Sequence, residues 1–554
     1  MHVFKSPEPD IPIPPCDLLT YLYEFVPVAD DTPLHAEAAN EKNVLNKAQC
    51  KDLTMRVASV LRRKLGIGAN GPEKDTVFMI SSGQMMLFAG FHGTLAAGGI
   101  SSPAGAALTS EELAKLFSLG KAKGVLCSED VLDNIKKAAK IYGMSEDRIL
   151  IMKDCAIYTI GGENLMTEDR LDWERVSDPE RLKNSLACIL FSSGTTGPPK
   201  GVMISHLNMV FEGEFARLRA VAAKEQAEQN GEVYEPMRTL GYLPVAHIAG
   251  VQGYLINPVA SGALVYWMPR FDFDNFIEFN RKYKINTLFT VPPILLLLVK
   301  SEKVTDHFAS LKSCIAGAAP LGKELQLAAS KKLGNGECFI TQTWGMTETT
   351  GSATAQPNNE MDTSGSVGRL IPNHYARLVD ENMNDVKPGE EGEIIIKGPV
   401  VTRGYYNNPK ATKDLFYDGW MRTGDVARTD PNDMGRFWIC DRLKELIKYN
   451  ALQIAPAELE ALLVSMEGVQ DAAVIGVQQE ATEVPRAYVV RSGPHITEQM
   501  VKDFIKSKAA SYKQLRGGVE FVDVIPKSPS GKILRKELRQ RAAAEFAAAT
   551  QAKL

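Results

Sequence analysis

A loop rich in hydroxyl groups and glycine follows an apolar run of the chain and ends in a lysine. The run covers residues 187–191, and the loop contains Ser192, Ser193, Gly194, Thr195, Thr196, Gly197 and Lys200. Glycine lets the backbone approach an anion, hydroxyls donate hydrogen bonds and lysine adds positive charge, so these residues predict a phosphate-binding loop. Its spacing, G-x-x-G-x-x-K, differs from the G-x-x-x-x-G-K-[ST] of the common P-loop, which indicates another nucleotide chemistry. A surface turn is the alternative.

Four more motifs follow the loop along the chain. They are Thr343-Trp344-Gly345-Met346-Thr347-Glu348, Gly419-Trp420-Met421-Arg422-Thr423-Gly424-Asp425, Asp441-Arg442-Leu443-Lys444-Glu445 and Pro529-Ser530-Gly531-Lys532. Together, and in this order, they resemble the acyl-adenylate-forming (AMP-binding) enzymes, above all the 4-coumarate-CoA ligase-like acyl-CoA synthetases. The resemblance implies a ligase that makes an acyl-adenylate and pyrophosphate from ATP and a carboxylic acid. Coenzyme A would then take the acyl group and release AMP.

The composition fits such an enzyme. Of its residues, 44% are apolar and 23% are charged, as in ordinary globular proteins. A chain of 554 residues is too long to fold around a single hydrophobic core, so more than one domain is predicted. A net charge of -4 argues against a nucleic-acid-binding protein. The eight cysteines are scattered without a C-x-x-C pair, which favours reduced thiols over disulfides or a metal site. The apolar segment 248–268 contains Gln252, Asn257 and Pro258, so no membrane span is expected.

Helical and strand-like segments alternate through most of the chain. A helical face at 50–65 precedes an apolar run at 76–80, and further runs lie at 124–127, 149–152, 187–191, 263–267 and 286–289. The alternation predicts an α/β fold with two parallel-type sheets, and residues 375–397 predict a small β subdomain. Polar stretches at 168–184 and 222–236 are interpreted as surface connections. We expect an adenylation domain at 1–441 and a smaller, mobile α+β domain at 442–554.

The resemblance assigns roles around the nucleotide. The 192–200 loop would cover the β- and γ-phosphates, Thr347 would bond the α-phosphate and Glu348 would bind Mg²⁺. Trp344, after Thr343, would stack on adenine. The other side of the base would be closed by Gly317, Ala318 and Ala319.

Three charged residues complete the predicted adenylation site. Asp425, expected in a turn after Gly424, matches the carboxylate that accepts both ribose hydroxyls, and Arg442 matches the base that contacts the same sugar. Lys532 would lie between the acid and ATP during adenylation and reduce their repulsion. The alternative for Asp425 and Arg442 is ordinary surface charge.

The second reaction would follow a rotation of the C-terminal domain about Lys444. Lys448 and Gln453 match a pair that contacts AMP and assists catalysis in 4-coumarate-CoA ligases. Between them the chain departs from the family, because Asn450-Ala451 stands where Lys-Gly is common. An alanine restricts φ and adds a methyl group near the expected path of pantetheine. Of the two half-reactions, the resemblance therefore supports thioester formation with CoA less strongly than adenylation.

The predicted acid pocket contains His247 as an aromatic gate, with Ala249, Gly253 and Ala318 as small lining residues. These small residues favour an aryl, arylalkanoic or medium-chain acid. A packed histidine is the alternative for His247. Alternative functions are adenylation of an amino acid or another acid without a CoA step, a luciferase-like monooxygenase, and a non-catalytic nucleotide-binding protein. The tripeptide Ala552-Lys553-Leu554 is similar to the Ser-Lys-Leu address, so a peroxisomal import receptor is an expected partner and the peroxisome the expected location.

Overall fold

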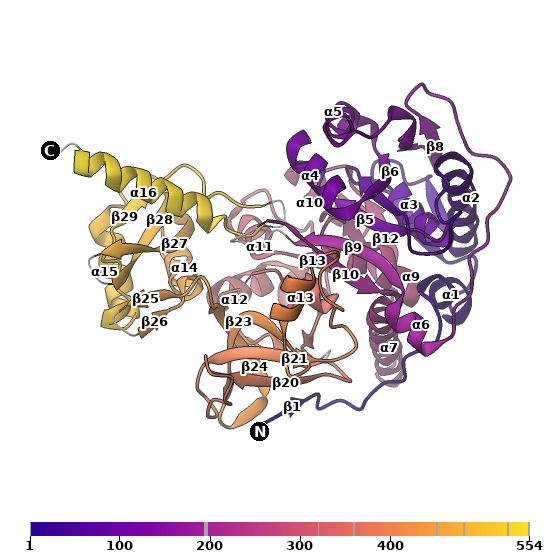
Figure 1. Ribbon diagram of the computed structural model, residues 1–554. Helices are drawn as coiled ribbons and strands as arrows, with labels where there is room; N and C mark the ends of the chain where they lie inside the picture. The colour runs from indigo at the N-terminus through magenta and orange to yellow at the C-terminus, as the bar shows by residue number, and fades with distance from the viewer. Residues whose placement is uncertain are drawn as a thin grey trace.

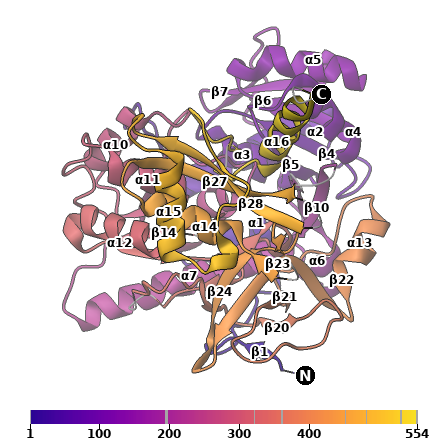
Figure 2. The same ribbon diagram turned by 90° about the vertical axis from the view of Figure 1, so that its left-hand side faces the viewer.

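The computed structural model describes residues 2–192, 198–319, 321–357, 361–449, 452–479, 482–528 and 531–551. Figure 1 shows a large part on the right, with several sheets and their covering helices, and a smaller C-terminal part on the left. Turned by 90°, the C-terminal part faces the viewer and lies in front of the large one (Figure 2). The expected α/β organisation with a smaller C-terminal unit is confirmed.

A seven-stranded sheet contains the apolar run before the predicted phosphate loop. Its order is β10 (Lys200–Ser205), β9 (Leu186–Ser192), β5 (Ile100–Ala104), β4 (Thr76–Ile80), β6 (Ala122–Cys127), β7 (Ile149–Lys153) and β8 (Ala156–Thr159). The five inner strands pair in parallel, and the two edge strands are antiparallel. Associated helices include α2 (Lys47–Leu65), α3 (Met86–Ala96), α4 (Ser110–Gly120) and α5 (Leu132–Tyr142). The apolar runs therefore became buried strands, as predicted.

The second predicted sheet is instead two sheets, which corrects the expected number. One contains β11 (Arg238–Gly241), β12 (Leu264–Trp267), β2 (Pro33–Glu37) and β3 (Val44–Asn46), and the other contains β13 (Thr287–Thr290), β14 (Ser313–Ala316) and β15 (Phe339–Gln342). Between their edges the Asn286 amide donates to the Arg238 carbonyl at 3.3 Å. The strands β13, β14 and β15 are parallel, so their carboxyl ends share one edge, where ligands commonly bind in such sheets.

The β subdomain is larger than the sequence predicted. Its sheet contains β1 (Phe4–Lys5), β20 (Tyr375–Val379), β21 (Gly392–Lys397), β23 (Trp420–Asp430), β24 (Asp433–Arg442), β19 (Gly368–Leu370) and β18 (Thr354–Ala355), with β22 (Phe416–Tyr417) paired to β23. The pairing is antiparallel throughout. Figure 1 shows this sheet below the other sheets, with the N-terminal strand β1 at its side.

Both predicted surface connections contain helix. Helix α6 (Pro179–Asn184) starts at a proline behind the N-cap Asp178, and α7 (His206–Gln229) runs well into the 222–236 stretch. The prediction at 222–229 was wrong because Ala, Lys, Glu and Gln have high helix propensity, and a helix can continue in solvent once its first turns are buried.

The C-terminal part has its own cores. It contains β25 (Ile447–Tyr449), β26 (Leu452–Ile454), α14 (Pro456–Ser465), β27 (Val469–Gln479), β28 (Thr482–Arg491), α15 (Glu498–Lys508), β29 (Val519–Phe521) and α16 (Arg535–Gln551). Two apolar clusters, centred on Leu459 and Val474 and on Tyr488 and Leu538, draw only on residues after 446. The division after residue 441 stays a prediction, and it falls one residue before β24 ends.

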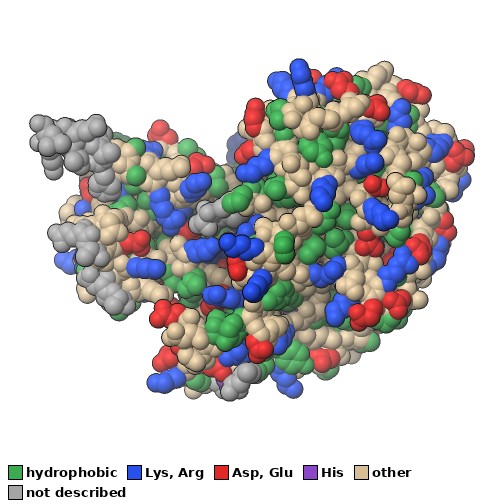
Figure 3. Space-filling view, viewed as in Figure 1, with side chains coloured by type: hydrophobic (Ala, Val, Ile, Leu, Met, Phe, Trp, Pro, Cys, Tyr) green, Lys and Arg blue, Asp and Glu red, His purple; other side chains and the backbone are tan. Residues whose placement is uncertain are grey.

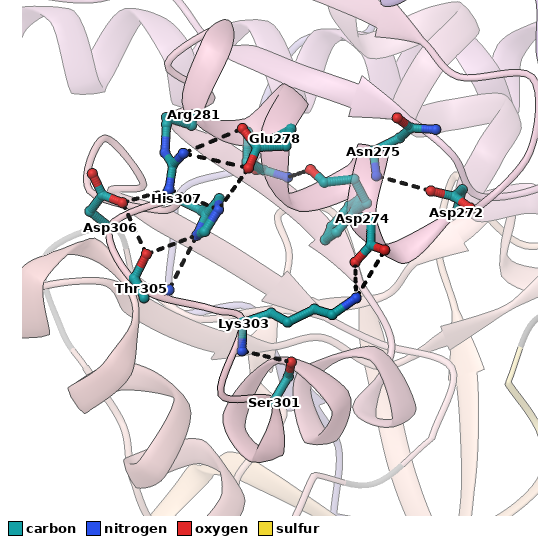
Figure 4. Close-up of polar contacts among 12 residues, drawn as sticks. Asp272, Asp274, Asn275, Glu278, Arg281, Ser301, Lys303, Thr305, Asp306 and His307 are labelled. Atoms are coloured by element: carbon teal, nitrogen blue, oxygen red, sulfur yellow. Dashed lines mark hydrogen bonds and ion pairs between the residues drawn. The ribbon is translucent and has the colours of Figure 1, made fainter.

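A polar cluster on the large part ties α10 (Phe273–Lys282) to the segment after α11 (Pro292–Lys300). Figure 4 shows His307 beside Glu278, with 3.1 Å between Nε2 and Oε1, and Lys303 against Asp274 at 2.6 Å. Exposed ion pairs contribute little to stability individually, but several of them across one junction restrain it. They restrain α11, whose first residues lie at the site described below.

Two further expectations concern thiols and membranes. All eight cysteines are free, and burial raises the pKa of several of their thiols, for example that of Cys127 to about 12. This agrees with the expected reduced state. Within the described parts of the chain, no helix has the length and apolarity that crossing a membrane requires.

Candidate active site

Lys532 of the C-terminal part lies among charged groups of the large part. Its pKa is lowered by burial and by the Arg442 cation, while the carboxylates of Asp425 and Glu348 act in the opposite direction. Burial and the charge of Lys532 lower the pKa of His247 to about 4. The amine is therefore close enough to all four side chains for their charges to interact.

The turn before Lys532 lies against α11. A methyl group at Gly531 would lie only 3.2 Å from Val291 Cγ2 and 3.3 Å from Pro293 Cγ. Val291 directly follows β13, so the C-terminal segment contacts the edge at which the three parallel strands end. Figure 3 shows an indentation between the two parts, with Lys and Arg side chains gathered where they meet.

Asp425 and Arg442 are direct neighbours across strands β23 and β24. The Trp344 indole donates to Asp425 Oδ2 at 2.8 Å, and Arg442 Nε lies 3.3 Å from Oδ1. The expectation that Asp425 lies in a turn was wrong, because it lies inside a strand. The strand is locally distorted there, because Gly424 has φ of 70° and the pairing register of β21 with β23 shifts. The glycine was therefore interpreted as part of a turn, although the strand continues through it.

Glu348 is buried and held by two contacts from one distant segment. The Tyr405 hydroxyl donates to its Oε1 at 2.9 Å, and the Thr402 amide donates to its main-chain carbonyl at 2.8 Å. The ammonium of Lys200 lies 4.8 Å from the centre of the Tyr405 ring. Tyr405 thus joins the loop lysine to the predicted metal ligand, and sequence analysis missed it because no local spacing connects position 405 to either residue.

The residues predicted around adenine follow the ends of β14 and β15. The Gly317 amide donates to the Thr290 carbonyl at 3.2 Å, and Ala318 has φ of 69°, a left-handed conformation that is uncommon for alanine. Ala319 is the next residue. Thr343 Oγ1 donates to the Thr354 carbonyl at 2.7 Å. Trp344 is buried, with 6% of its surface exposed, and its indole makes the hydrogen bond to Asp425 described above.

The phosphate loop is only partly described. Ser192 and Lys200 are partners in the β9–β10 pair, so the two ends of the loop lie side by side. Ser193, Gly194, Thr195, Thr196 and Gly197 lie outside the described residues. Thr347 begins a short 3-10 helix, Thr347–Thr349, that also carries Glu348.

The predicted acid-pocket residues lie on one irregular helical segment. His247 precedes α8 (Ile248–Gly250), which continues as η4 (Val251–Ile256) and α9 (Asn257–Ser261). Ala249 is exposed, whereas a methyl group at Gly253 would lie 3.5 Å from the Phe289 ring. The segment thus runs from the neighbourhood of Lys532 toward β13.

Comparison with known proteins identifies the family. Residues 27–406 match the family model described as AMP-binding enzyme, and residues 458–532 match that described as AMP-binding enzyme C-terminal domain. The chain belongs to the AMP-binding enzyme family.

Relatives of this AMP-binding enzyme match it over nearly their whole length. A protein of Emericella nidulans provisionally named an acyl-coenzyme A synthetase is 44% identical, covering 97% of this chain and 98% of its own. A 4-coumarate–CoA ligase of Solanum tuberosum is 35% identical, covering 98% and 97%. The crystal structure of ATP-bound MatB from Rhodopseudomonas palustris has a TM-score of 0.79 and 26% identity, covering 95% and 98%. The expected activity class is thereby confirmed: the protein is an ATP-dependent acid–CoA ligase.

Two residues expected to act in the CoA step of this AMP-binding enzyme lie elsewhere. Lys448 and Gln453 are partners in the β25–β26 pair, and both are exposed. No contact within the described parts of the chain links them to Lys532. Asn450 and Ala451 lie outside the described residues, and Lys444 is exposed in the turn after β24.

Proposed function

We propose that this ligase activates an aryl, arylalkanoic or medium-chain acid at the Lys532 site and then transfers the acyl group to CoA. The observation that carries the proposal is the entry of Lys532, from the C-terminal part, among Asp425, Glu348, Arg442 and His247 of the large part. A cation delivered to a carboxylate-lined phosphate site suits the joining of two anions.

In the first step a carboxylate oxygen of the acid attacks the α-phosphorus of ATP, and pyrophosphate leaves with the electrons of the broken P–O bond. Lys532 lies between the two anions and lowers their repulsion. Asp425 accepts the ribose hydroxyls and Arg442 contacts the sugar. Thr347 and the 192–200 loop, with Lys200, donate to the phosphates, while Trp344 and residues 317–319 enclose adenine.

Glu348 is the residue that would hold Mg²⁺. Its Oε1 accepts from Tyr405, and none of the described residues donates to its Oε2. Within the described residues no group of three His, Cys, Asp or Glu side chains could form a cage. This fits a magnesium site, because Mg²⁺ usually takes one or two carboxylates, with phosphate oxygens and water as its other ligands. A bound Mg²⁺ would neutralise phosphate charge and orient the triphosphate.

In the second step the CoA thiol attacks the acyl carbonyl, the mixed anhydride breaks and AMP leaves. We propose that the C-terminal part rotates about Lys444, which withdraws Lys532 and brings Lys448 and Gln453 to the nucleotide. Their exposure supports this, since they are available for a second docking. Ala451 stands between Lys448 and Gln453 in the sequence, and the resemblance to the family implies that pantetheine would pass its methyl group where glycine is common.

The acid class rests on the residues around His247. The resemblance to the family places Ala249, Gly253 and Ala318 in the acid pocket with His247, whose imidazole is kept neutral at pH 7 by burial and by the charge of Lys532. The resemblance to a 4-coumarate–CoA ligase supports a flat aromatic acid.

We further propose import into peroxisomes through Ala552-Lys553-Leu554 and its receptor. The support is the tripeptide itself, a small residue, a base and a leucine. Removal of these three residues should leave a fluorescent fusion in the cytosol while catalysis is unchanged. Continued peroxisomal fluorescence would contradict the proposal.

The decisive test of the reaction is acid-dependent release of pyrophosphate over a panel of aryl and fatty acids, with and without CoA. We expect release with aryl acids, and acyl-CoA only when CoA is present. Adenylate that accumulates and never reaches CoA would contradict the second step. Light emission with oxygen would instead identify a luciferase-like enzyme.

A further inference from the structure

Residues 400–406 link the strand after the phosphate loop to the turn that carries Glu348. The Met203 amide donates to the Gly404 carbonyl at 3.0 Å, so the segment pairs with β10, the edge strand of the seven-stranded sheet. The Thr402 amide donates to the Glu348 carbonyl at 2.8 Å. The segment is therefore held by main-chain hydrogen bonds to both the phosphate-loop strand and the predicted metal ligand.

Tyr405 and Lys200 are diagonal neighbours across this pairing. Tyr405 forms a β-bridge with Val202, and Lys200 lies two residues before Val202 in the same strand. Side chains two residues apart in a strand point to the same face, and diagonal neighbours are within reach when one is aromatic and the other long. The Lys200 ammonium accordingly lies 4.8 Å from the centre of the Tyr405 ring, which is a cation–π contact.

The hydroxyl of the same ring contacts Glu348. It donates to Oε1 at 2.9 Å and is the sole donor to that carboxylate among the described residues. Both side chains are buried, Tyr405 with 8% and Glu348 with 6% of its surface exposed, so water competes little for this bond. Tyr405 thus holds two groups of opposite charge, one with its ring face and the other with its hydroxyl.

The orientation of Glu348 matters for the ion that it would hold. Mg²⁺ requires near-octahedral geometry and takes few protein ligands, so another side chain does not easily replace a misoriented carboxylate. Hydrogen bonds to a ligating carboxylate fix its orientation, and their loss typically lowers metal affinity about 10- to 100-fold. The Tyr405 hydroxyl supplies such a bond to one oxygen of Glu348.

We propose that Tyr405 is a positioning residue that couples metal binding to phosphate binding: its hydroxyl orients the Glu348 carboxylate for Mg²⁺, and its ring places the Lys200 ammonium for the triphosphate. This inference rests on the roles proposed above for Glu348 and Lys200. Because different parts of one side chain make the two contacts, the two effects can be removed separately.

The test measures the Kd of ATP by isothermal titration calorimetry without any acid, so that no turnover occurs, once with Mg²⁺ and once with EDTA. Tyr405→Phe keeps the ring and loses the hydroxyl. It should reduce the gain in affinity from Mg²⁺ about tenfold and leave the Kd in EDTA unchanged. Tyr405→Leu also loses the ring, so it should in addition weaken binding in EDTA about two- to fivefold.

Tyr406→Phe is the matched control. Tyr406 is the next residue of the segment, and its side chain packs against an apolar cluster that includes Ile100 and Ile189. Successive side chains of an extended segment point to opposite sides, so removal of this hydroxyl should leave both Kd values unchanged. A change as large as that in Tyr405→Phe would overturn the inference.

A double variant separates positioning from a structural role. If Tyr405 acts through the carboxylate of Glu348, Tyr405→Phe should have no further effect on the gain from Mg²⁺ in a Glu348→Gln background. A loss that persists there, a loss that is equal with Mg²⁺ and with EDTA, or unchanged binding in Tyr405→Phe would overturn the inference alone. No gain from Mg²⁺ in the unaltered protein would overturn the proposed role of Glu348, and this inference with it.

Discussion

The charged groups of the active site are held in two different ways in the two parts of the molecule. In the large part Asp425 is bonded to Trp344 and paired with Arg442, and Glu348 is bonded to Tyr405. The main chain of Lys532 is bonded within its own unit, by a turn in which the Ser528 amide donates to the Lys532 carbonyl at 2.8 Å and the Lys532 amide donates to Ser528 Oγ at 3.2 Å. Its position over the large part depends on how the two parts dock.

The contacts that the structure describes between the two parts are both polar and apolar. The Lys300 ammonium donates to the Val469 carbonyl, the Ala457 amide donates to Asp441 Oδ2 at 3.0 Å, and a methyl group at Gly322 would lie 3.3 Å from Ala461 Cβ. Domains of one chain commonly move relative to one another unless their interface is large and hydrophobic. The comparison therefore teaches that the groups we propose for nucleotide binding are fixed within the large part, whereas the position of the Lys532 amine depends on how the two parts dock.

The largest effect should come from Lys532→Ala. Removing the delivered charge should lower acid-dependent pyrophosphate release about 10²–10³-fold, because one preorganised charge contributes that much to such transition states. Thioester formation from supplied acyl-adenylate and CoA should be nearly unchanged. Pyrophosphate release at the normal rate would remove Lys532 from the mechanism.

The fixed charged groups of the large part are tested by the Asp425→Asn substitution. The charge that pairs with Arg442 is lost while a carbonyl oxygen still accepts from Trp344, so we expect the KM for ATP to rise about 10- to 100-fold. Asp433→Asn is the control, since Asp433 pairs with Arg369 at 2.8 Å in the same sheet and faces no reacting group. An equal rise of KM in both variants would show that the effect is structural.

Lowering the pH should reduce the stability of the large part more than that of the C-terminal part. Burial lowers the pKa of His35 and of His92 in the large part to about 3, whereas the ordinary value is about 6.5. Between these values the unfolded chain binds protons that the folded chain does not, so stability is complete above pH 6.5 and falls as the pH is lowered. At pH 5 the loss is about 2 kcal/mol for each histidine.

Calorimetry at pH 7.5 and at pH 5 should therefore show a lower Tm for the large part in acid. The His35→Asn variant keeps an acceptor for the Trp267 indole, which donates to His35 Nδ1 at 3.2 Å, and should show a smaller shift. A Tm that is independent of pH over this range would contradict the assignment of neutral buried histidines.

The smallest effect is expected from Lys300→Met. The substitution removes the bond to the Val469 carbonyl and keeps most of the side-chain volume, so pyrophosphate release should fall two- to fivefold, as expected of one partly buried hydrogen bond. Lys303→Met is the matched control, because Lys303 pairs with Asp274 within the large part. A loss in Lys303→Met as large as in Lys300→Met would argue against a docking role.

Sequence analysis could predict what consecutive residues determine. The apolar run before Ser192 gave β9, and the helical face at 50–65 gave most of α2, since periodicity and turn residues act locally. The pairing of Asp425 with Arg442 depends instead on strand register over a β-hairpin with a bulge, and the Tyr405–Glu348 bond depends on tertiary packing. Neither of these two contacts produces a residue spacing that could be recognised in the sequence.

Arg442 is the last residue of β24, and the turn with Lys444 begins at the next position. The Leu443 amide also donates to the Gly424 carbonyl at 2.8 Å, one residue before the acidic partner of that guanidinium. A ribose bound by this pair, as we propose, would therefore be held next to the segment that connects the large part to the C-terminal part. In the proposed cycle the departure of AMP would free Arg442, two residues before the proposed hinge at Lys444, so product release would be coupled to the return rotation.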